Sequence, residues 1–132
     1  MPGLSSDNVF SHLEENLKKH KVFDRVDIFE TASSNRKFLD DFLIPYLKKN
    51  PIGFLMIDAD GQIDRDLNEL RPYLLPGCFV MIDDYMMQSS KCTQGFANKS
   101  IPSQKAVHNL VNSGQAVSLG VYLWNTWFGQ IV

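Results

Sequence analysis

Aspartates follow two short apolar segments of this chain. The segment GFLMIDAD contains Asp58 and Asp60, and the segment CFVMIDDY contains Asp83 and Asp84. Carboxylates that share one place repel each other unless a cation lies among them. Oxygen ligands of this kind suit a hard divalent ion such as Mg²⁺. The residue types therefore predict a metal or substrate site, provided that the fold brings the two segments together.

Both apolar segments are predicted to be parallel strands of one sheet. Each is short and almost wholly apolar, the first after Pro51 and the second after Pro76 and Gly77, as in strands buried on both faces. Between them, apolar residues recur at the spacing of a helix: Ile63, Leu67, Leu70 and Leu74. A strand, a crossover helix and a second strand place both carboxyl ends at one edge, where open α/β sheets bind ligands.

The aspartates also have a simpler explanation. Strand ends in any α/β protein tolerate acids that face solvent, and Asp60 is placed to cap the next helix. The occurrence of Asp58, Asp83 and Asp84 on neighbouring strand tips favours a metal or substrate site. His12, His20 and His108 lack ligand spacing to one another and are given no role.

The other patterns predict an α/β fold whose last strands are antiparallel. We expect a helix that starts near Ser5 to Asp7, and a second helix that carries Phe38 to Leu47 and is capped by Ser33 or Ser34. The remaining predicted elements are a strand over Arg25 to Glu30, a loop over Met86 to Ser103, a helix over Ser103 to Asn112, and the strands AVSLGVYLW and WFGQIV.

Length and composition exclude several classes of protein. A chain of 132 residues is enough for one domain, expected over residues 1–132. A net charge of −2 argues against a partner nucleic acid. No apolar signal segment or run of about 20 apolar residues occurs, so we expect a cytoplasmic protein without a membrane partner. Cys78 and Cys92 form no CxxC pair and are expected to be free thiols.

Three segments resemble class I S-adenosylmethionine-dependent methyltransferases, in particular the metal-dependent O-methyltransferases. DRVDIFETASS resembles the family's third strand and the turn beside the adenine, IDADGQIDRDLNELRPYLLPG its fourth strand and helix, and FVMIDDY its fifth strand. The resemblance implies a Rossmann-like methyltransferase sheet, mostly parallel with an antiparallel C-terminal strand. It also implies methyl transfer to a small hydroxylated substrate.

The resemblance assigns roles to particular residues. It implies that Asp58, Asp83 and Asp84 bind Mg²⁺ or a similar divalent cation, which lowers the pKa of the attacking hydroxyl. The resemblance implies that S-adenosylmethionine contacts Ala32, Ser33 and Asp58. It also implies that Asp60 contacts the metal ligands without binding the metal itself. No residue is assigned a catalytic role.

The chain also departs from the family. The first strand with its glycine-rich turn and the ribose-binding acid have no counterpart, and Gly61 stands where relatives carry a catalytic lysine. We therefore expect a partial domain that lacks the first two strands, binds the cofactor poorly and is inactive alone.

Two other functions compete with this interpretation. The first is a non-catalytic, truncated module that binds metal or forms a homo-oligomer, since an unpaired strand edge promotes association. The second, a phosphorylation receiver, fails because no later Asp follows Asp84 to accept the phosphate.

Overall fold

The computed structural model describes residues 6–59, 62–86, 94–123 and 125–132. The chain divides into two compact units, Met1–Thr31 and Ala32–Val132, and each is described by itself. The single domain predicted over residues 1–132 stays a prediction. Among the described residues, no helix combines the length and the apolarity that crossing a bilayer requires.

The first unit contains the predicted first helix but not the predicted strand. Helix α1 (Ser6–Lys19) is followed by the short 3-10 helix η1 (Phe23–Arg25). The strand predicted over Arg25 to Glu30 is wrong, because the residues after η1 have no regular secondary structure. Their alternating pattern suits a strand, but Val26 and Phe29 are 40% and 45% exposed. A strand forms only where a neighbour pairs with its backbone, and no described strand belongs to this unit.

The second unit opens with the predicted second helix, built from three consecutive segments. These are α2 (Arg36–Phe38), the π-helical turn η2 (Leu39–Leu43) and α3 (Ile44–Lys49). Asn35 caps the helix, and its side chain accepts a hydrogen bond of 3.2 Å from the backbone N–H of Phe38. The predicted serine cap is therefore wrong, because the helix begins after Asn35, which leaves the serines too early in the chain. Arg36 pairs with Asp40, and its hydrogen bond holds the pKa of that carboxyl below its usual range.

The sheet of the second unit has four strands in the order β1-β2-β4-β3. They are β1 (Ile52–Ile57), β2 (Leu74–Ile82), β3 (Ala116–Tyr122) and β4 (Thr126–Ile131). Strands β1 and β2 are parallel and joined by α4 (Ile63–Leu70) and the 3-10 helix η3 (Arg71–Tyr73). Strand β4 pairs antiparallel with both β2 and β3. The α/β class, the parallel pair with its crossover helix and the antiparallel finish are confirmed. The sheet expected to be mostly parallel has one parallel pairing, β1 with β2, and two antiparallel pairings.

The helix before β3 is longer than predicted. Helix α5 runs over Gln94–Asn112, although the sequence pattern favoured a helix only from Ser103. Pro102 lies inside α5, where a proline removes one backbone hydrogen bond and normally marks a boundary. Ser100 and Ser103 are only 2% and 0% exposed, so small polar residues that are typical of a loop are packed here as helix.

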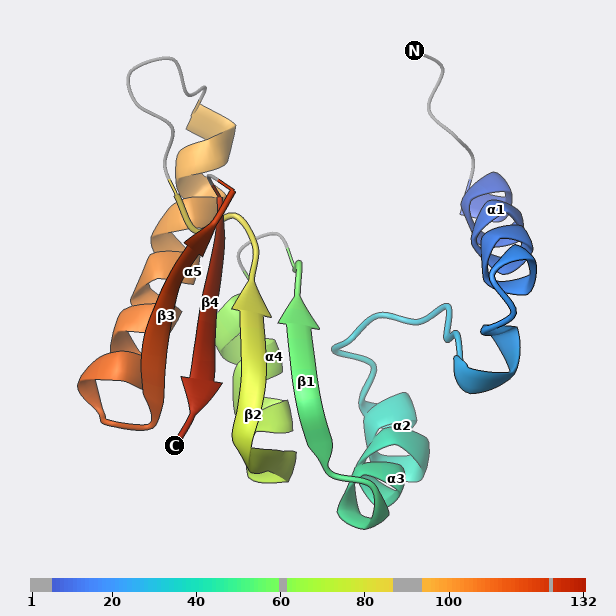
Figure 1. The fold of residues 1–132 in the computed structure, drawn as a ribbon, viewed down its shortest axis with the longest axis horizontal. Helices are drawn as coiled ribbons and strands as arrows, with labels where there is room; N and C mark the ends of the chain where they lie inside the picture. The colour runs from blue at the N-terminus through green and yellow to red at the C-terminus, as the bar shows by residue number, and fades with distance from the viewer. Residues whose placement is uncertain (1–5, 60–61, 87–93, 124) are drawn as a thin grey trace. The chain divides into compact units, whose positions relative to one another are not determined.

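The core of the second unit lies between one face of the sheet and the helices α4 and α5. Figure 1 shows both helices on the same side of the sheet. The buried residues of this core are Ile57, Ile63, Leu67, Cys78, Val80, Ile82, Ala106, Val107, Leu110, Ala116 and Trp127. The segment before β1 is tied to α4 by an ion pair of 2.7 Å between Arg36 and Glu69. The helix that precedes β1 is thereby linked to the crossover helix.

Candidate functional site

The predicted aspartates lie at the carboxyl ends of the parallel pair. Asp58 directly follows β1, and Asp83 and Asp84 directly follow β2. Ile57 and Ile82 are paired in register, and the backbone N–H of Asp83 donates a hydrogen bond of 3.0 Å to the carbonyl of Ile57. This bond continues the ladder beyond the last paired residues. The strand ends therefore stay together where the acids begin.

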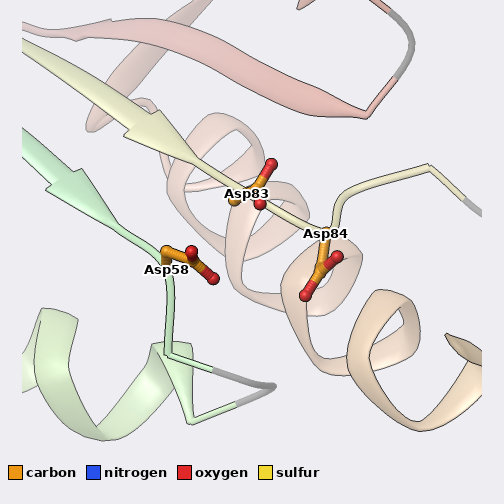
Figure 2. Close-up of side chains that lie close together, drawn as sticks. All are labelled: Asp58, Asp83 and Asp84. Atoms are coloured by element: carbon orange, nitrogen blue, oxygen red, sulfur yellow. The ribbon is translucent and has the colours of Figure 1, made fainter. Parts of the chain in front are cut away.

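The three carboxylates form one cluster. One oxygen from each of Asp58, Asp83 and Asp84 lies within 4.8 Å of the other two. Figure 2 shows the three side chains at the ends of their strands. Asp58 is exposed, and Asp83 and Asp84 are half-buried. Oxygens bound to one ion are at most about 4.2 Å apart for Mg²⁺ and about 4.8 Å apart for a typical Ca²⁺. The three oxygens are thus no farther apart than opposite ligands of one Ca²⁺ ion.

Two residues that sequence analysis missed hold the carboxylates of β2. The hydroxyl of Thr126 donates a hydrogen bond of 2.7 Å to Asp83 Oδ1. The side-chain amide of Asn125 donates one of 3.1 Å to Asp84 Oδ1. An ionised carboxylate has about four acceptor positions, which hydrogen-bond donors and a cation can share. Asn125 and Thr126 lie where the last strand begins, and local sequence pattern gives no signal for these contacts.

Asn125 also fixes the backbone that follows the aspartates. Its carbonyl accepts from the backbone N–H of Tyr85 at 2.8 Å, and its Oδ1 accepts from that of Met86 at 3.1 Å. Gln104 of α5 donates a hydrogen bond of 2.8 Å to the carbonyl of Tyr85. Asp84 has φ +53°, in the left-handed region that Asp and Asn tolerate better than most residues. The tip of β2 is therefore held from two sides in a turn conformation.

Two of the residues implied to contact S-adenosylmethionine lie in the turn before α2. Ala32 and Ser33 are both exposed. The Ser33 hydroxyl accepts a hydrogen bond of 2.7 Å from Arg65 of α4, which also donates to Asp66. This contact gives Ser33 a structural role in joining the turn to α4. Cofactor binding by Ala32, Ser33 and Asp58 stays a prediction, and Asp60 lies outside the described residues.

A separate groove lies between α4 and α5. It has a volume of about 640 Å³, and its lining includes Asp64, Arg71 and Lys105 but none of the three clustered aspartates. The candidate metal cluster is therefore an open site at the sheet edge and does not belong to this groove.

Among the solved structures that resemble the chain are two O-methyltransferases. A candidate O-methyltransferase from Klebsiella pneumoniae aligns with a TM-score of 0.57 and 14% identity over 96% of this chain. An O-methyltransferase from Bacillus cereus, solved in complex with SAH, aligns with a TM-score of 0.57 and 12% identity over 98%. No protein-family model matches the chain, and no curated protein sequence matches it.

These likenesses establish the fold. At such low identity they show shared architecture alone, and they confirm the Rossmann-like methyltransferase sheet that the sequence led us to expect. The chain spans 58% of the length of the Klebsiella pneumoniae structure and 60% of that from Bacillus cereus. The fold and the carboxylate cluster together are the basis for the function proposed next.

Proposed function

We propose that this chain is the metal-binding, C-terminal part of a class I S-adenosylmethionine-dependent methyltransferase. The observation that carries the proposal is the cluster of Asp58, Asp83 and Asp84, with one oxygen of each within 4.8 Å of the others. It lies at the carboxyl edge of a parallel strand pair, where open α/β sheets bind their ligands. The likeness to O-methyltransferase structures supports the same activity class.

The proposed reaction is methyl transfer to a small substrate with hydroxyl groups. A divalent cation such as Mg²⁺ supplies positive charge that lowers the pKa of a bound hydroxyl. Asp58, Asp83 and Asp84 hold that charge at the strand ends. Thr126 and Asn125 orient two of these carboxylates, so the ligand oxygens need little rearrangement when the cation binds.

Cofactor binding belongs to the same proposal. The Bacillus cereus protein was solved with SAH, and we propose that Ala32, Ser33 and Asp58 of this chain lie on the side of the site that takes S-adenosylmethionine. The glycine-rich turn expected beside the methionine end has no counterpart in the sequence. We therefore expect weak cofactor binding and no turnover by this chain alone, because methyl transfer needs the sulfonium held in line with its acceptor.

Metal binding is tested by thermal unfolding during a titration with Mg²⁺ and Mn²⁺. A ligand that binds only the folded state stabilises it by about 2.7 kcal/mol at one hundred times its Kd. We expect the melting temperature to rise with metal in the wild type and not in Asp83→Asn. The matched control is Asp41→Asn, an exposed acid of η2 outside the cluster, which should respond like the wild type. A wild-type melting temperature that does not change at millimolar metal would refute the metal site.

A second candidate is a non-catalytic module that binds metal without transferring methyl groups. It is favoured by the partial span, since the chain covers only 58% and 60% of the two aligned structures. Calorimetry with S-adenosylmethionine, in the presence of saturating Mg²⁺, separates the two candidates. Binding supports the enzyme fragment, and metal binding without cofactor binding supports the module.

A further inference from the structure

One face of the sheet is apolar and lies open within the second unit. No charged residue occurs in β1, β2, β3 or β4. Successive side chains of a strand point to opposite faces, and the core residues Ile57, Val80, Ile82 and Trp127 mark the face that α4 and α5 cover. The alternate residues and the registered pairs define the opposite face, here called the open sheet face: Phe54, Met56, Phe79, Met81, Val117, Tyr122 and Phe128, with the uncharged polar residues Thr126 and Gln130.

The side chains of the open sheet face are large and accessible. Phe54 and Met56 of β1 are 57% and 54% exposed, and Val117 and Tyr122 of β3 are 53% and 62% exposed. At the centre, the rings of Phe79 and Phe128 are stacked with centroids 5.4 Å apart. Parallel strand pairs are ordinarily covered on both faces. The residue types on this surface are therefore those of a sheet face that another element or another chain covers.

We propose that the open sheet face binds the open sheet face of a second copy of this chain. The absence of charge in all four strands is the first reason, because a two-fold contact brings the same surface of both copies together, and charges of one sign on that surface would repel each other. Geometry is the second. Stacked sheets lie about 10 Å apart, which one layer of Phe and Met side chains from each copy fills.

The size of the face is the third reason. Four strands about 4.8 Å apart and about 20 Å long give the sheet a flat area, its footprint, on the order of 400 Å². The uneven surface of the side chains adds to this area. Two copies would then bury about 800 Å² of this footprint, and more once the side chains are counted, which is at the lower limit of specific interfaces. Apolar patches of several hundred Å² are uncommon on the surfaces of monomers. We therefore expect a dimer that dissociates on dilution.

The test is sedimentation equilibrium of the full chain over a concentration series, with and without Mg²⁺. The wild type should dimerise in both conditions, since none of the residues that define the open sheet face belongs to the aspartate cluster. Met56→Lys and Tyr122→Lys place a charge at opposite ends of the open sheet face, and each should raise the dimer Kd at least about tenfold, or about 1.4 kcal/mol. The control is Ile101→Lys on α5, which is 57% exposed on the other side of the sheet and should leave the Kd unchanged.

Three results would overturn the proposal. The first is a wild type that stays monomeric throughout the series. The second is equal weakening by Ile101→Lys, which would indicate a nonspecific effect of added charge. The third is weakening by Met56→Lys alone, which would place the contact at the β1 edge, since Tyr122 lies in β3 at the far end of the strand order. Circular dichroism of each variant establishes that it is folded, and two separate face variants keep the test decisive if one of them does not fold.

Discussion

The hydroxyl of Thr126 donates a hydrogen bond of 2.7 Å to Asp83, and the pairing of the strands brings the two residues together. Ile82, the last residue of β2, pairs with Trp127 of the antiparallel strand β4. The residue after Ile82 therefore faces the residue before Trp127. Asp83 and Thr126 are those neighbours. A strand near the end of the chain therefore positions a carboxylate that follows the second strand, 43 residues earlier.

Replacing Thr126 by Val should weaken metal binding without removing a metal ligand. Val keeps the shape of Thr but cannot donate to Asp83, so this carboxylate loses its fixed orientation. Loss of a residue that orients a ligand typically costs 10- to 100-fold in metal affinity, and we expect about tenfold for this half-buried site. Mn²⁺ titration followed by thermal unfolding measures the effect. Thr126→Ser keeps the hydroxyl and should bind like the wild type, and a Ser variant as weak as the Val variant would contradict the role of the hydrogen bond.

Asp84 should tolerate Asn but not Val. Its φ of +53° lies in the left-handed region, which costs a β-branched residue about 1–2 kcal/mol. Asn tolerates that region and removes one charge from the cluster, so Asp84→Asn should leave the metal-free protein as stable as the wild type or more so. Urea unfolding in EDTA measures both variants. Equal stability of the Val and Asn variants would show that the backbone turn does not depend on this residue.

The sequence was sufficient for the parts of the site that depend on local pattern. Two short apolar runs joined by a helical repeat allow only a parallel pair with a crossover helix, and that topology brings Asp58 to Asp83 and Asp84. Thr126 and Asn125 were not predicted, because their contacts depend on the register between β2 and β4, which local pattern does not encode.

The elements predicted wrongly failed for a similar reason. Apolar and polar residues alternate over Arg25 to Glu30, as in a strand with one buried face. A strand also needs a neighbouring strand that pairs with its backbone. The start of α5 was placed too late because Pro102 and the serines around it are typical of loops, whereas the burial of Ser100 and Ser103 depends on tertiary packing.

Gly129 should be the glycine of the sheet that is least able to accept a side chain. A Cβ at this position would lie 2.1 Å from the ring of Trp127, which is 1% exposed and donates a hydrogen bond of 2.9 Å to Ser118. A ring held in this way cannot move aside cheaply, so Gly129→Ala should cost about 1–3 kcal/mol of unfolding free energy. Gly53→Ala in β1 is the matched control, since a Cβ added there would meet no atom within 4 Å and its effect should be within about 0.5 kcal/mol. Chemical unfolding measures the stability of both variants. An equal loss of stability in the two would contradict this packing.

Cys78 should be nearly inert to thiol reagents while the protein is folded. It is 1% exposed in β2, and burial raises the pKa of its thiol above the ordinary range. The thiolate is the reactive form, so both lost access and the raised pKa slow its modification at neutral pH. In a Cys92→Ala background, where Cys78 is the sole cysteine, reaction should require opening of the sheet. For a domain stable by about 5 kcal/mol, global opening lowers the rate more than a thousandfold relative to the unfolded chain.

The control for Cys78 is a cysteine of known accessibility on the same scaffold. Ile101→Cys with both native cysteines replaced by Ala puts a thiol at a position that is 57% exposed, and it should react at close to the rate of the unfolded chain. Labelling of Cys78 should accelerate with urea in parallel with unfolding measured by circular dichroism, because both then report the same opening. Rapid labelling in the absence of urea would mean that β2 is accessible at its centre, and would contradict the core that α4 and α5 form over this face.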